Sequence, residues 1–214
     1  MSKILVVGGT GYAGGAVVRD AASRGHDVTS VSRNAPKDPV PGVAYVTGNV
    51  TAPAFLAEAV AGAEVIVSTL SPRGELDGKI GDVDRALADL ARRNGARLFV
   101  VGGFNSLRPA EGEPTGAEGG QIPAEYRSEA LQMHAILNHL KTEPEGLDWV
   151  FVSPAEAFGA YVPGEDLGRY RIGGDVALVD ENGRSAISGA DFARAIVDRI
   201  DEADYHRAHI SVAY

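Results

Sequence analysis

Short apolar runs alternate with amphipathic stretches along most of the chain. The runs are rich in Val and Ile and too short for helices, as expected of strands buried on both faces of a sheet. They are Ile4–Val7, Val28–Val31, Ala44–Val46, Val65–Leu70, Leu98–Val101 and Trp149–Val152. Because helical patterns lie between these runs, the sequence predicts an α/β fold with a doubly wound parallel sheet.

The helical patterns have clear ends. The best-defined pattern places Val83, Ala86, Leu87 and Leu90 at i, i+3, i+4 and i+7, and it stops at Asn94-Gly95, a common C-terminal signal. The first helix is expected to stop at Gly25. Further helices are predicted over about Glu125–Lys141, with Ala130, Met133, Leu137 and Leu140 inward, and over about Asp191–Ile200.

Two stretches depart from this alternation. Arg108–Ile122 is rich in Gly, Pro and Glu and is predicted to be a surface loop. From Gly159 onward Gly, Tyr and Arg dominate, and a hairpin is expected over Val176–Ile187 with its turn at Glu181–Gly183. A closing strand is expected around Ile210, Val212 and Tyr214. We expect one Rossmann domain over residues 1–214, with a small C-terminal extension on the substrate side.

Composition narrows the classes of function. Apolar residues make up 44% of the 214 residues, enough for a sizeable core, and the net charge is −9, which argues against nucleic acid and anionic membranes as partners. The absence of Cys excludes disulfides and thiolate chemistry, and the five His show no metal-ligand spacing, so we expect no metal. The N-terminus lacks a signal-peptide pattern, and we expect a cytoplasmic protein.

The segment Gly8–Gly14 carries the strongest chemical signal. It follows a predicted strand, opens a predicted helix and spaces three glycines as Gly8, Gly11 and Gly14. Such glycines allow a tight turn, close approach of a pyrophosphate to the backbone and close helix–strand packing. The helix N-terminus then offers free N–H groups to the phosphates. This context predicts dinucleotide binding.

The end of the second predicted strand indicates which dinucleotide binds. An NAD-specific site has an Asp or Glu there for the ribose hydroxyls, whereas this chain has Ser32 and Arg33. An Arg can pair with a 2′-phosphate through its planar guanidinium. We therefore expect NADP(H), and the alternative is that Arg33 is an ordinary solvated loop residue.

Several motifs together resemble one family. They are the GxxGxxG turn, SRN after the second strand, VVGG and then SL within Val100–Leu107, and the block YRIGGDVALVDENGRSAIS followed by DFARAIVDRID. With these motifs the chain resembles the atypical short-chain dehydrogenase/reductase group of NADH-flavin reductases, allied to NmrA-like NAD(P)-binding proteins. A more distant likeness is to biliverdin-IXβ/flavin reductase.

The resemblance implies a set of cofactor contacts at the carboxyl ends of the strands. Gly8, Thr10, Gly11, Tyr12, Ala13 and Gly14 match the phosphate-binding turn, and Ser32 and Arg33 match the side that contacts the adenosine ribose. Asn49 and Val50 match a segment near the adenine, and Leu70 and Ser71 follow the fourth strand. Gly102, Gly103, Ser153, Pro154 and Ala155 follow the fifth and sixth strands, beside the nicotinamide. Many relatives carry Asp where this chain has Asn49-Val50.

The usual proton donor of short-chain dehydrogenases, a Tyr with a Lys four residues later, is absent. None of Lys3, Lys37, Lys79 and Lys141 has this spacing. The remaining catalytic candidates are Ser106, which could equally be a cap, and Tyr126, which is followed at that spacing by Ala130. Phe104, Phe158, Tyr161 and Tyr170 could stack on a flat substrate or could simply pack.

Hydride transfer to a flavin needs alignment of two rings more than a protein acid. The sequence therefore favours an NAD(P)H-dependent oxidoreductase that passes a hydride from NADPH to a flavin or similar planar acceptor. The alternatives are a non-catalytic NADP(H)-sensing regulator of the NmrA-like kind and a sugar-nucleotide epimerase or dehydratase, against which the missing Tyr–Lys pair counts. We expect a monomer or homodimer with a small-molecule substrate, and residues 159–175 as one wall of the acceptor pocket.

Overall fold

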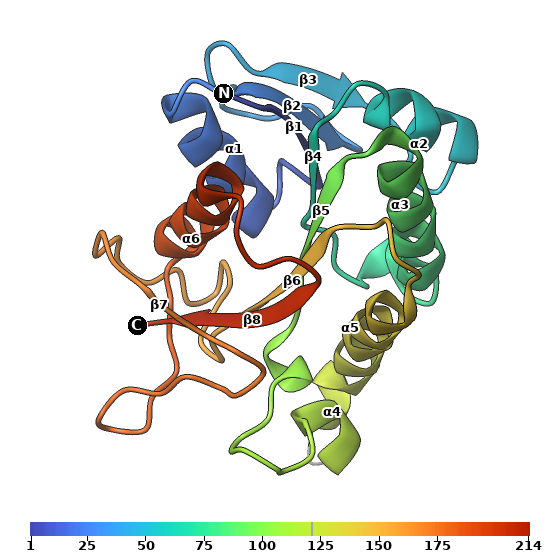
Figure 1. The fold of residues 1–214 in the computed structure, drawn as a ribbon. Coiled ribbons are helices and arrows are strands. Elements are labelled where there is room, and N and C mark those ends of the chain that lie inside the picture. The colour runs from blue at the N-terminus through green and yellow to red at the C-terminus, as the bar shows by residue number, and fades with distance from the viewer. Residues whose placement is uncertain (121) are drawn as a thin grey trace.

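A computed structural model describes residues 1–120 and 122–214 (Figure 1). In this part of the chain one eight-stranded sheet has the order β3-β2-β1-β4-β5-β6-β8-β7. The strands are β1 (Lys3–Val7), β2 (Asp27–Ser32), β3 (Ala44–Thr47), β4 (Val65–Ser68), β5 (Arg97–Val101), β6 (Trp149–Pro154), β7 (Arg171–Gly173) and β8 (Ala208–Ala213). All described pairs are parallel except β7 with β8. The predicted doubly wound α/β fold is confirmed.

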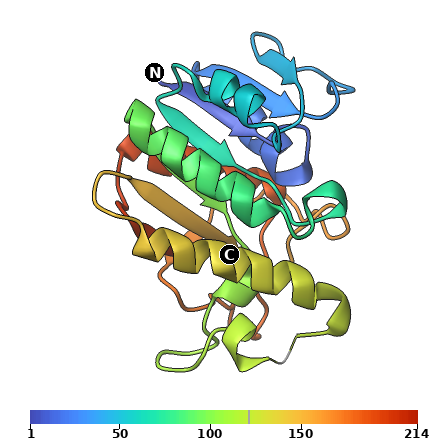
Figure 2. The same cartoon turned by 90° about the vertical axis from the view of Figure 1, so that its right-hand side faces the viewer.

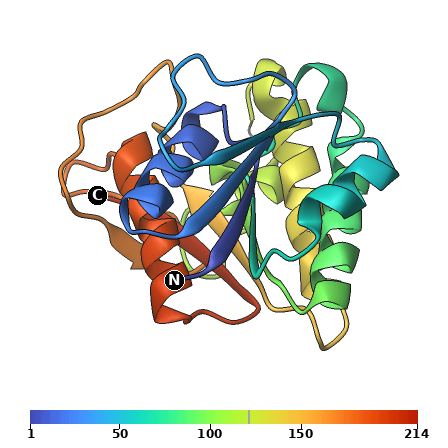
Figure 3. The ribbon, with the colours of Figure 1, turned by 90° about the horizontal axis from the view of Figure 1, so that it is seen from above.

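Helices cover both faces of the sheet (Figures 1 and 3). One face carries α1 (Tyr12–Ser23) and α6 (Gly189–Glu202); the other carries α2 (Pro53–Val60), α3 (Ile80–Asn94) and α5 (Ala124–Thr142), with short turns η1 (Gly74–Leu76), η2 (Phe104–Ser106) and α4 (Gly116–Gly119) in the connections. The strand order reverses at β1, because the chain continues from β1 to β2 and β3 on one side of it and then returns to β4 on the other side. The connections that leave β1 and β4 therefore run in opposite directions. A crevice outside the carboxyl ends of β1 and β4 is the expected ligand position for this topology.

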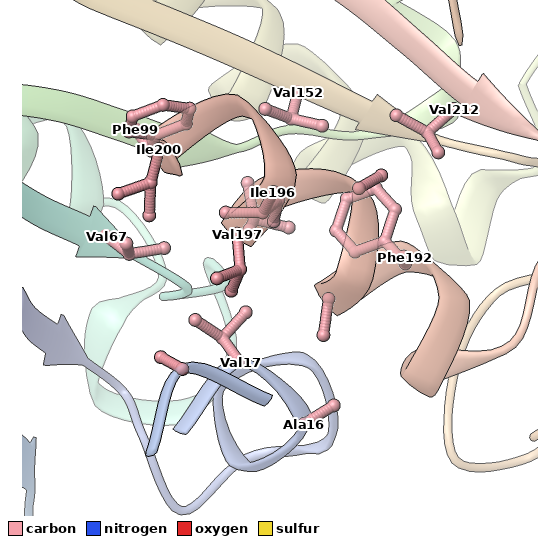
Figure 4. Close-up of a cluster of buried hydrophobic side chains, with 14 of the residues drawn as sticks. Ala16, Val17, Val67, Phe99, Val152, Phe192, Ile196, Val197, Ile200 and Val212 are labelled. Carbon is pink, nitrogen blue, oxygen red and sulfur yellow. The ribbon is translucent and has the colours of Figure 1, made fainter. Parts of the chain in front are cut away.

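The core under α1 and α6 is shared by a helix from the N-terminal part of the chain and a helix from its C-terminal part. Figure 4 shows Val17 of α1 beside Val197 of α6, with Phe192 of the same helix facing the sheet. These side chains are fully or almost fully buried. Since α1 begins at the glycine turn, the packing of α6 fixes the position of that turn.

On the opposite face, α3 and α5 lie side by side against the sheet (Figure 2), and their buried positions follow the predicted helical periodicity. Val83 and Leu87 of α3 and Met133 and Leu137 of α5 are buried in one cluster against the sheet. The helix α3 ends at Asn94, and its C-cap residue Gly95 adopts the left-handed conformation with φ of 65°. The Asn94-Gly95 stop signal is therefore confirmed.

The prediction that Arg108–Ile122 is a surface loop is partly wrong, and Gln121 lies outside the described residues. The short helix α4 starts from a capping box in which Thr115 and Glu118 satisfy each other's backbone N–H groups. Thr115, Ala117 and Ile122 are buried. The high Gly and Pro content therefore conceals a capped helical turn that packs inward.

The hairpin predicted over Val176–Ile187 is wrong. Its turn forms, because the Asp180 side chain accepts hydrogen bonds from the backbone N–H groups of Asn182 and Arg184, each at 2.8 Å. Its arms share one backbone hydrogen bond beside the turn, from the Asp180 N–H to the Arg184 carbonyl at 2.8 Å, and no further pairing within the described residues; Val176 bridges to Arg108 and Ala186 bridges to Ala157. Each arm thus pairs with a distant segment instead of its neighbour.

The expected strand Val65–Leu70 also ends earlier, at Ser68.

Candidate functional site

The glycine turn leaves β1 and enters α1 through a tight backbone arrangement. Gly8 has a φ of +90° and donates to the Val31 carbonyl at 2.8 Å, and the Gly11 N–H donates back to the Gly8 carbonyl at 2.9 Å. Gly11 is the N-cap of α1 and provides no side-chain cap. The first helical hydrogen bond joins the Gly15 N–H to the Gly11 carbonyl at 2.8 Å. The N–H groups of the first turn therefore have no intrahelical acceptor and suit an anion.

The three spaced glycines have different roles in this geometry. A Cβ at Gly14 would overlap the Gly8 carbonyl oxygen and lie 2.5 Å from Thr69 Oγ1, so Gly14 lets the helix approach the sheet. Gly8 needs its positive φ. A Cβ at Gly11 would meet only the Gly8 carbonyl oxygen, at 3.3 Å, among the described atoms within 4 Å. Gly11 therefore borders open space in front of the helix N-terminus.

That space is part of a cavity of about 410 Å³ at the carboxyl ends of β1, β2 and β4. Its volume falls within the range of small-molecule sites. Nine of the residues predicted to bind cofactor line it: Gly8, Thr10, Gly11, Ser32, Arg33, Asn49, Val50, Leu70 and Ser71. The structure thus brings the residues predicted to contact the phosphates, the ribose and the adenine around one cavity.

Local hydrogen bonds fix the predicted ribose and adenine positions. The Ser32 hydroxyl accepts from the Thr10 N–H at 3.2 Å, so it also anchors the glycine turn. The Asn49 side chain accepts from the Thr51 N–H at 2.9 Å and closes a small turn over Val50. These contacts hold the wall of the cavity in a defined shape.

Seven further residues line the cavity and escape the sequence prediction. They are Val31, Thr51, Thr69, Arg73, Glu75, Leu76 and Lys79. The last four belong to the connection between β4 and α3, which bends back across the cavity through η1. The prediction was limited to residues directly after each strand, and no local pattern in the sequence indicates that this connection turns back across the cavity.

The cavity lining is cationic although the whole chain is acidic. The guanidinium of Arg33 lies 3.4 Å from the Glu75 carboxylate, and Arg73 Nε lies 2.8 Å from the Glu129 carboxylate. The hydrogen bond to Glu129 raises the pKa of Arg73 above its usual value. Lys79 adds a third positive charge. A phosphate-bearing ligand suits this set of donors.

Residues predicted on the nicotinamide side lie at the ends of β5 and β6, outside the lining of this cavity. The Ser153 hydroxyl donates to the Gly103 carbonyl at 3.1 Å and lies 2.9 Å from Nε2 of His209. Since that hydroxyl has a single hydrogen, His209 Nε2 carries the hydrogen between them. Burial lowers the pKa of His209 to about 4, so the ring is neutral. This chain of hydrogen bonds holds the two strand ends together.

Tyr12 does not line the cavity either, and its hydroxyl has two partners. It donates to the Pro163 carbonyl at 2.7 Å and accepts from the Gly189 N–H at 2.8 Å. The ring meets Phe158 edge-on, with centroids 5.3 Å apart. Tyr12 therefore connects the glycine turn to the C-terminal third of the chain. Ala13 packs against the core beneath α1.

The segment 159–175 is fastened to α6 by a buried carboxylate. Asp191 accepts from the Leu167 N–H at 2.8 Å and from the Tyr214 hydroxyl at 2.6 Å. Arg194 of α6 pairs with Asp166 at 3.1 Å. These contacts position the segment near the N-terminus of α6, and its role as a wall of the acceptor pocket stays a prediction.

None of the predicted catalytic and substrate residues lines the 410 Å³ cavity as the described residues define it. Ser106 is 1% exposed, and Tyr126, near the start of α5, is 51% exposed. Phe158 packs on Phe192 with centroids 4.6 Å apart, and the Tyr170 hydroxyl bonds to Asp198. The catalytic and substrate assignments stay predictions.

A second cavity, of about 250 Å³, takes in Phe104, the remaining substrate candidate. Its lining is mostly apolar and consists of Phe104, Asn105, Leu107, Pro109, Glu113, Pro114, Thr115, Gly116, Gly119 and Ala177. It lies between η2, α4 and the segment that bridges to Arg108.

Comparison with known proteins gives one family match and a relative over the full length. Residues 8–203 match the family model described as NAD(P)H-binding. The uncharacterized protein YwnB of Bacillus subtilis (strain 168) is 30% identical over 212 residues, which span 98% of this chain and 97% of YwnB.

Three solved structures match this chain over at least 97% of their own lengths. A candidate exported protein from Burkholderia pseudomallei is 37% identical with a TM-score of 0.87, covering 100% of both chains. A candidate NADH-flavin reductase from Streptococcus pneumoniae TIGR4 is 26% identical with a TM-score of 0.87, covering 100% of this chain and 99% of that one. A candidate epimerase from Bacteroides thetaiotaomicron is 29% identical with a TM-score of 0.88, covering 100% and 97%.

No helix in residues 1–120 and 122–214 has the length and apolar character needed to cross a bilayer. Because one similar structure is described as exported, the cytoplasmic location expected from the sequence stays a prediction.

Proposed function

The chain belongs to the NAD(P)H-binding family, and from that premise we propose that it is an NADPH-dependent oxidoreductase that reduces a flavin or a similar planar acceptor. One observation carries the proposal: the glycine turn, with open space in front of Gly11, faces a cavity lined by three cationic side chains. Phosphates of a dinucleotide would accept hydrogen bonds from the first turn of α1, and the cations would balance their charge.

The preference for NADPH rests on Arg33 at the end of β2. A guanidinium there, with no acid directly after the strand, favours a 2′-phosphate over a free ribose hydroxyl. Ser32 beside it is engaged with the glycine turn, which leaves Arg33 as the exposed group at this position.

The choice of acceptor rests on the side chains available for chemistry. Ser106 is buried beneath the surface, and Tyr126 has no Lys four residues later. A carbonyl substrate needs a proton donor at the reacting oxygen, whereas a flavin accepts a hydride at N5 and can take its proton from water. The bound nicotinamide supplies the hydride. The protein has to bind and align the two rings at about 3–3.5 Å.

Two similar structures support different readings of this site. The Streptococcus pneumoniae protein is described as a candidate NADH-flavin reductase and the Bacteroides thetaiotaomicron protein as a candidate epimerase. An epimerase that oxidises a sugar hydroxyl needs a base in contact with substrate, and the absent Tyr–Lys pair argues against it here.

The test is consumption of NADPH, followed by its absorbance, with FMN, riboflavin and quinones under anaerobic conditions. We expect turnover that Gly11→Val abolishes. Tight NADPH binding without turnover on any of these acceptors would contradict the reductase and favour an NADP(H)-sensing protein. Turnover of a sugar nucleotide would favour the epimerase.

A further inference from the structure

Lys79 is a cation of the cavity to which no specific part of the ligand has been assigned. It precedes α3 as its N-cap residue, and its backbone N–H bonds to the Leu76 carbonyl at 3.0 Å, which fixes it to the end of η1. It lines the same cavity as Gly11 and Arg33. Within residues 1–120 and 122–214 its ammonium forms no ion pair, whereas Arg33 and Arg73 each have a carboxylate partner.

Glu75 is the only acid in the described lining of this cavity. Its carboxylate lies 3.4 Å from Arg33, and the side chains of the pair are 74% and 59% exposed, respectively. An exposed pair at this separation contributes little stability. A phosphate with close to two negative charges attracts a guanidinium more strongly than a carboxylate does, so it can take the place of Glu75.

Glu75 and Lys79 reach the cavity from the same bend of the chain. Gly74 and Gly78 have φ values of +60° and +74°, and these left-handed residues turn the connection back toward β2. The bend therefore brings one negative and one positive side chain into the lining of the cavity that also contains Arg33. Such a set of charges can distinguish ligands that differ in the charge of one substituent.

We propose that Lys79 and Arg33 together bind the 2′-phosphate of NADP(H), and that Glu75 holds Arg33 until that phosphate displaces it. The inference rests on the proposed function, since it assumes an adenine dinucleotide in this cavity. With NADH, Glu75 can accept a hydrogen bond from the free 2′-hydroxyl, the role that an acid at the end of the second strand has in NAD sites. In the parent protein Glu75 therefore lowers the ratio of the affinity for NADPH to the affinity for NADH, and Lys79 raises this ratio.

The experiment uses two probes of the adenosine half, adenosine 2′,5′-bisphosphate and adenosine 5′-monophosphate, titrated by calorimetry into the parent and three variants. Lys79→Gln should weaken binding of the bisphosphate about tenfold and of the monophosphate less than about twofold. Glu75→Gln should tighten the bisphosphate at least about threefold and leave the monophosphate equal or weaker.

Lys3→Gln is the matched control, because Lys3 lies at the amino end of β1, away from the cavity at the carboxyl end, and its substitution loses the same charge. It should change neither affinity. Thermal melting of each variant checks the fold; Lys79 and Glu75 are both exposed, so their substitutions should leave it intact.

An equal loss of both probes in Lys79→Gln would overturn the assignment, because it would place Lys79 at the 5′-phosphate. Unchanged affinities in Glu75→Gln would overturn the role of Glu75. Neither probe undergoes hydride transfer, so these results stand apart from the acceptor assay. Bisphosphate binding as expected with no reductase turnover would contradict only the proposed reaction.

Discussion

Replacing Gly11 by Val tests whether the open space in front of α1 belongs to the ligand. The backbone at Gly11 is extended, with φ of −76° and ψ of 178°, which a Val adopts without strain. A new Cβ meets only the Gly8 carbonyl oxygen, at 3.3 Å, among described atoms within 4 Å. The cost to folding is therefore about 1 kcal/mol or less, partly offset by the lower entropy of the unfolded chain.

The expected effect on binding is much larger. The Val side chain would occupy the space through which a pyrophosphate reaches the N–H groups of the first turn. Losing two charge-assisted hydrogen bonds of about 1.5–3 kcal/mol each weakens NADPH binding more than about a hundredfold. In a domain of this size a 1 kcal/mol change moves Tm by about 2–4 °C, so the melting temperature should stay within that range.

Gly14→Ala provides the contrast, because its methyl group would overlap the Gly8 carbonyl and lie 2.5 Å from Thr69 Oγ1. We expect overpacking of about 1–3 kcal/mol and a Tm lowered by about 5 °C. Circular dichroism melts and NADPH titrations of both variants decide the matter. An unfolded Gly11→Val, or one that binds NADPH as tightly as the parent, would refute the reasoning.

Three further outcomes follow from individual side chains. Arg33→Asp should weaken NADPH about tenfold and favour NADH; equal affinities of the parent for the two cofactors would contradict the role of Arg33. Tyr126→Phe should leave kcat with FMN within about twofold, and a fall of about a hundredfold would make Tyr126 a general acid. Burial raises the pKa of Asp84 to about 7 from its usual 3.8. The folded state therefore holds that proton while the unfolded chain loses it, and the contribution of Asp84 to stability is present below pH 4 and lost as pH rises toward 7. Asp84→Asn should gain stability over the parent between pH 4 and pH 8, by up to about 4 kcal/mol in urea unfolding, whereas Asp82→Asn on the exposed face should show no such trend.

The sequence predicts the sheet well because its signals are local. Each buried strand is a short run of Val and Ile, and α3 carries its own stop signal at Gly95. The strand β7 was missed, since its three residues are partly exposed and pair with β8, far along the chain. The hairpin failed for a related reason: pairing of Val176 with Arg108 depends on contacts that no local pattern encodes.

The residues of the candidate site also differ in whether a local sequence pattern could place them. Residues directly after strands, such as Arg33 and Leu70, could be placed from the rule that ligands bind at the carboxyl ends of parallel strands. Glu75 and Lys79 could not, because their position depends on the reversal at Gly74 and Gly78. Tyr12 shows the converse: it stands within the motif, yet its hydroxyl is used to hold Pro163 and Gly189.

The link from Tyr12 to Gly189 also sets an order of events during synthesis. These residues are 177 positions apart, so at about 5–20 residues per second the ribosome delivers the second about 9–35 s after the first. Throughout that interval the apolar face of α1 lacks the helix that covers it. The glycine turn is translated before α6 but is completed only after it, and until α6 emerges Val17 and its neighbours lack their packing partners, so the nascent chain exposes an apolar surface that chaperones can bind.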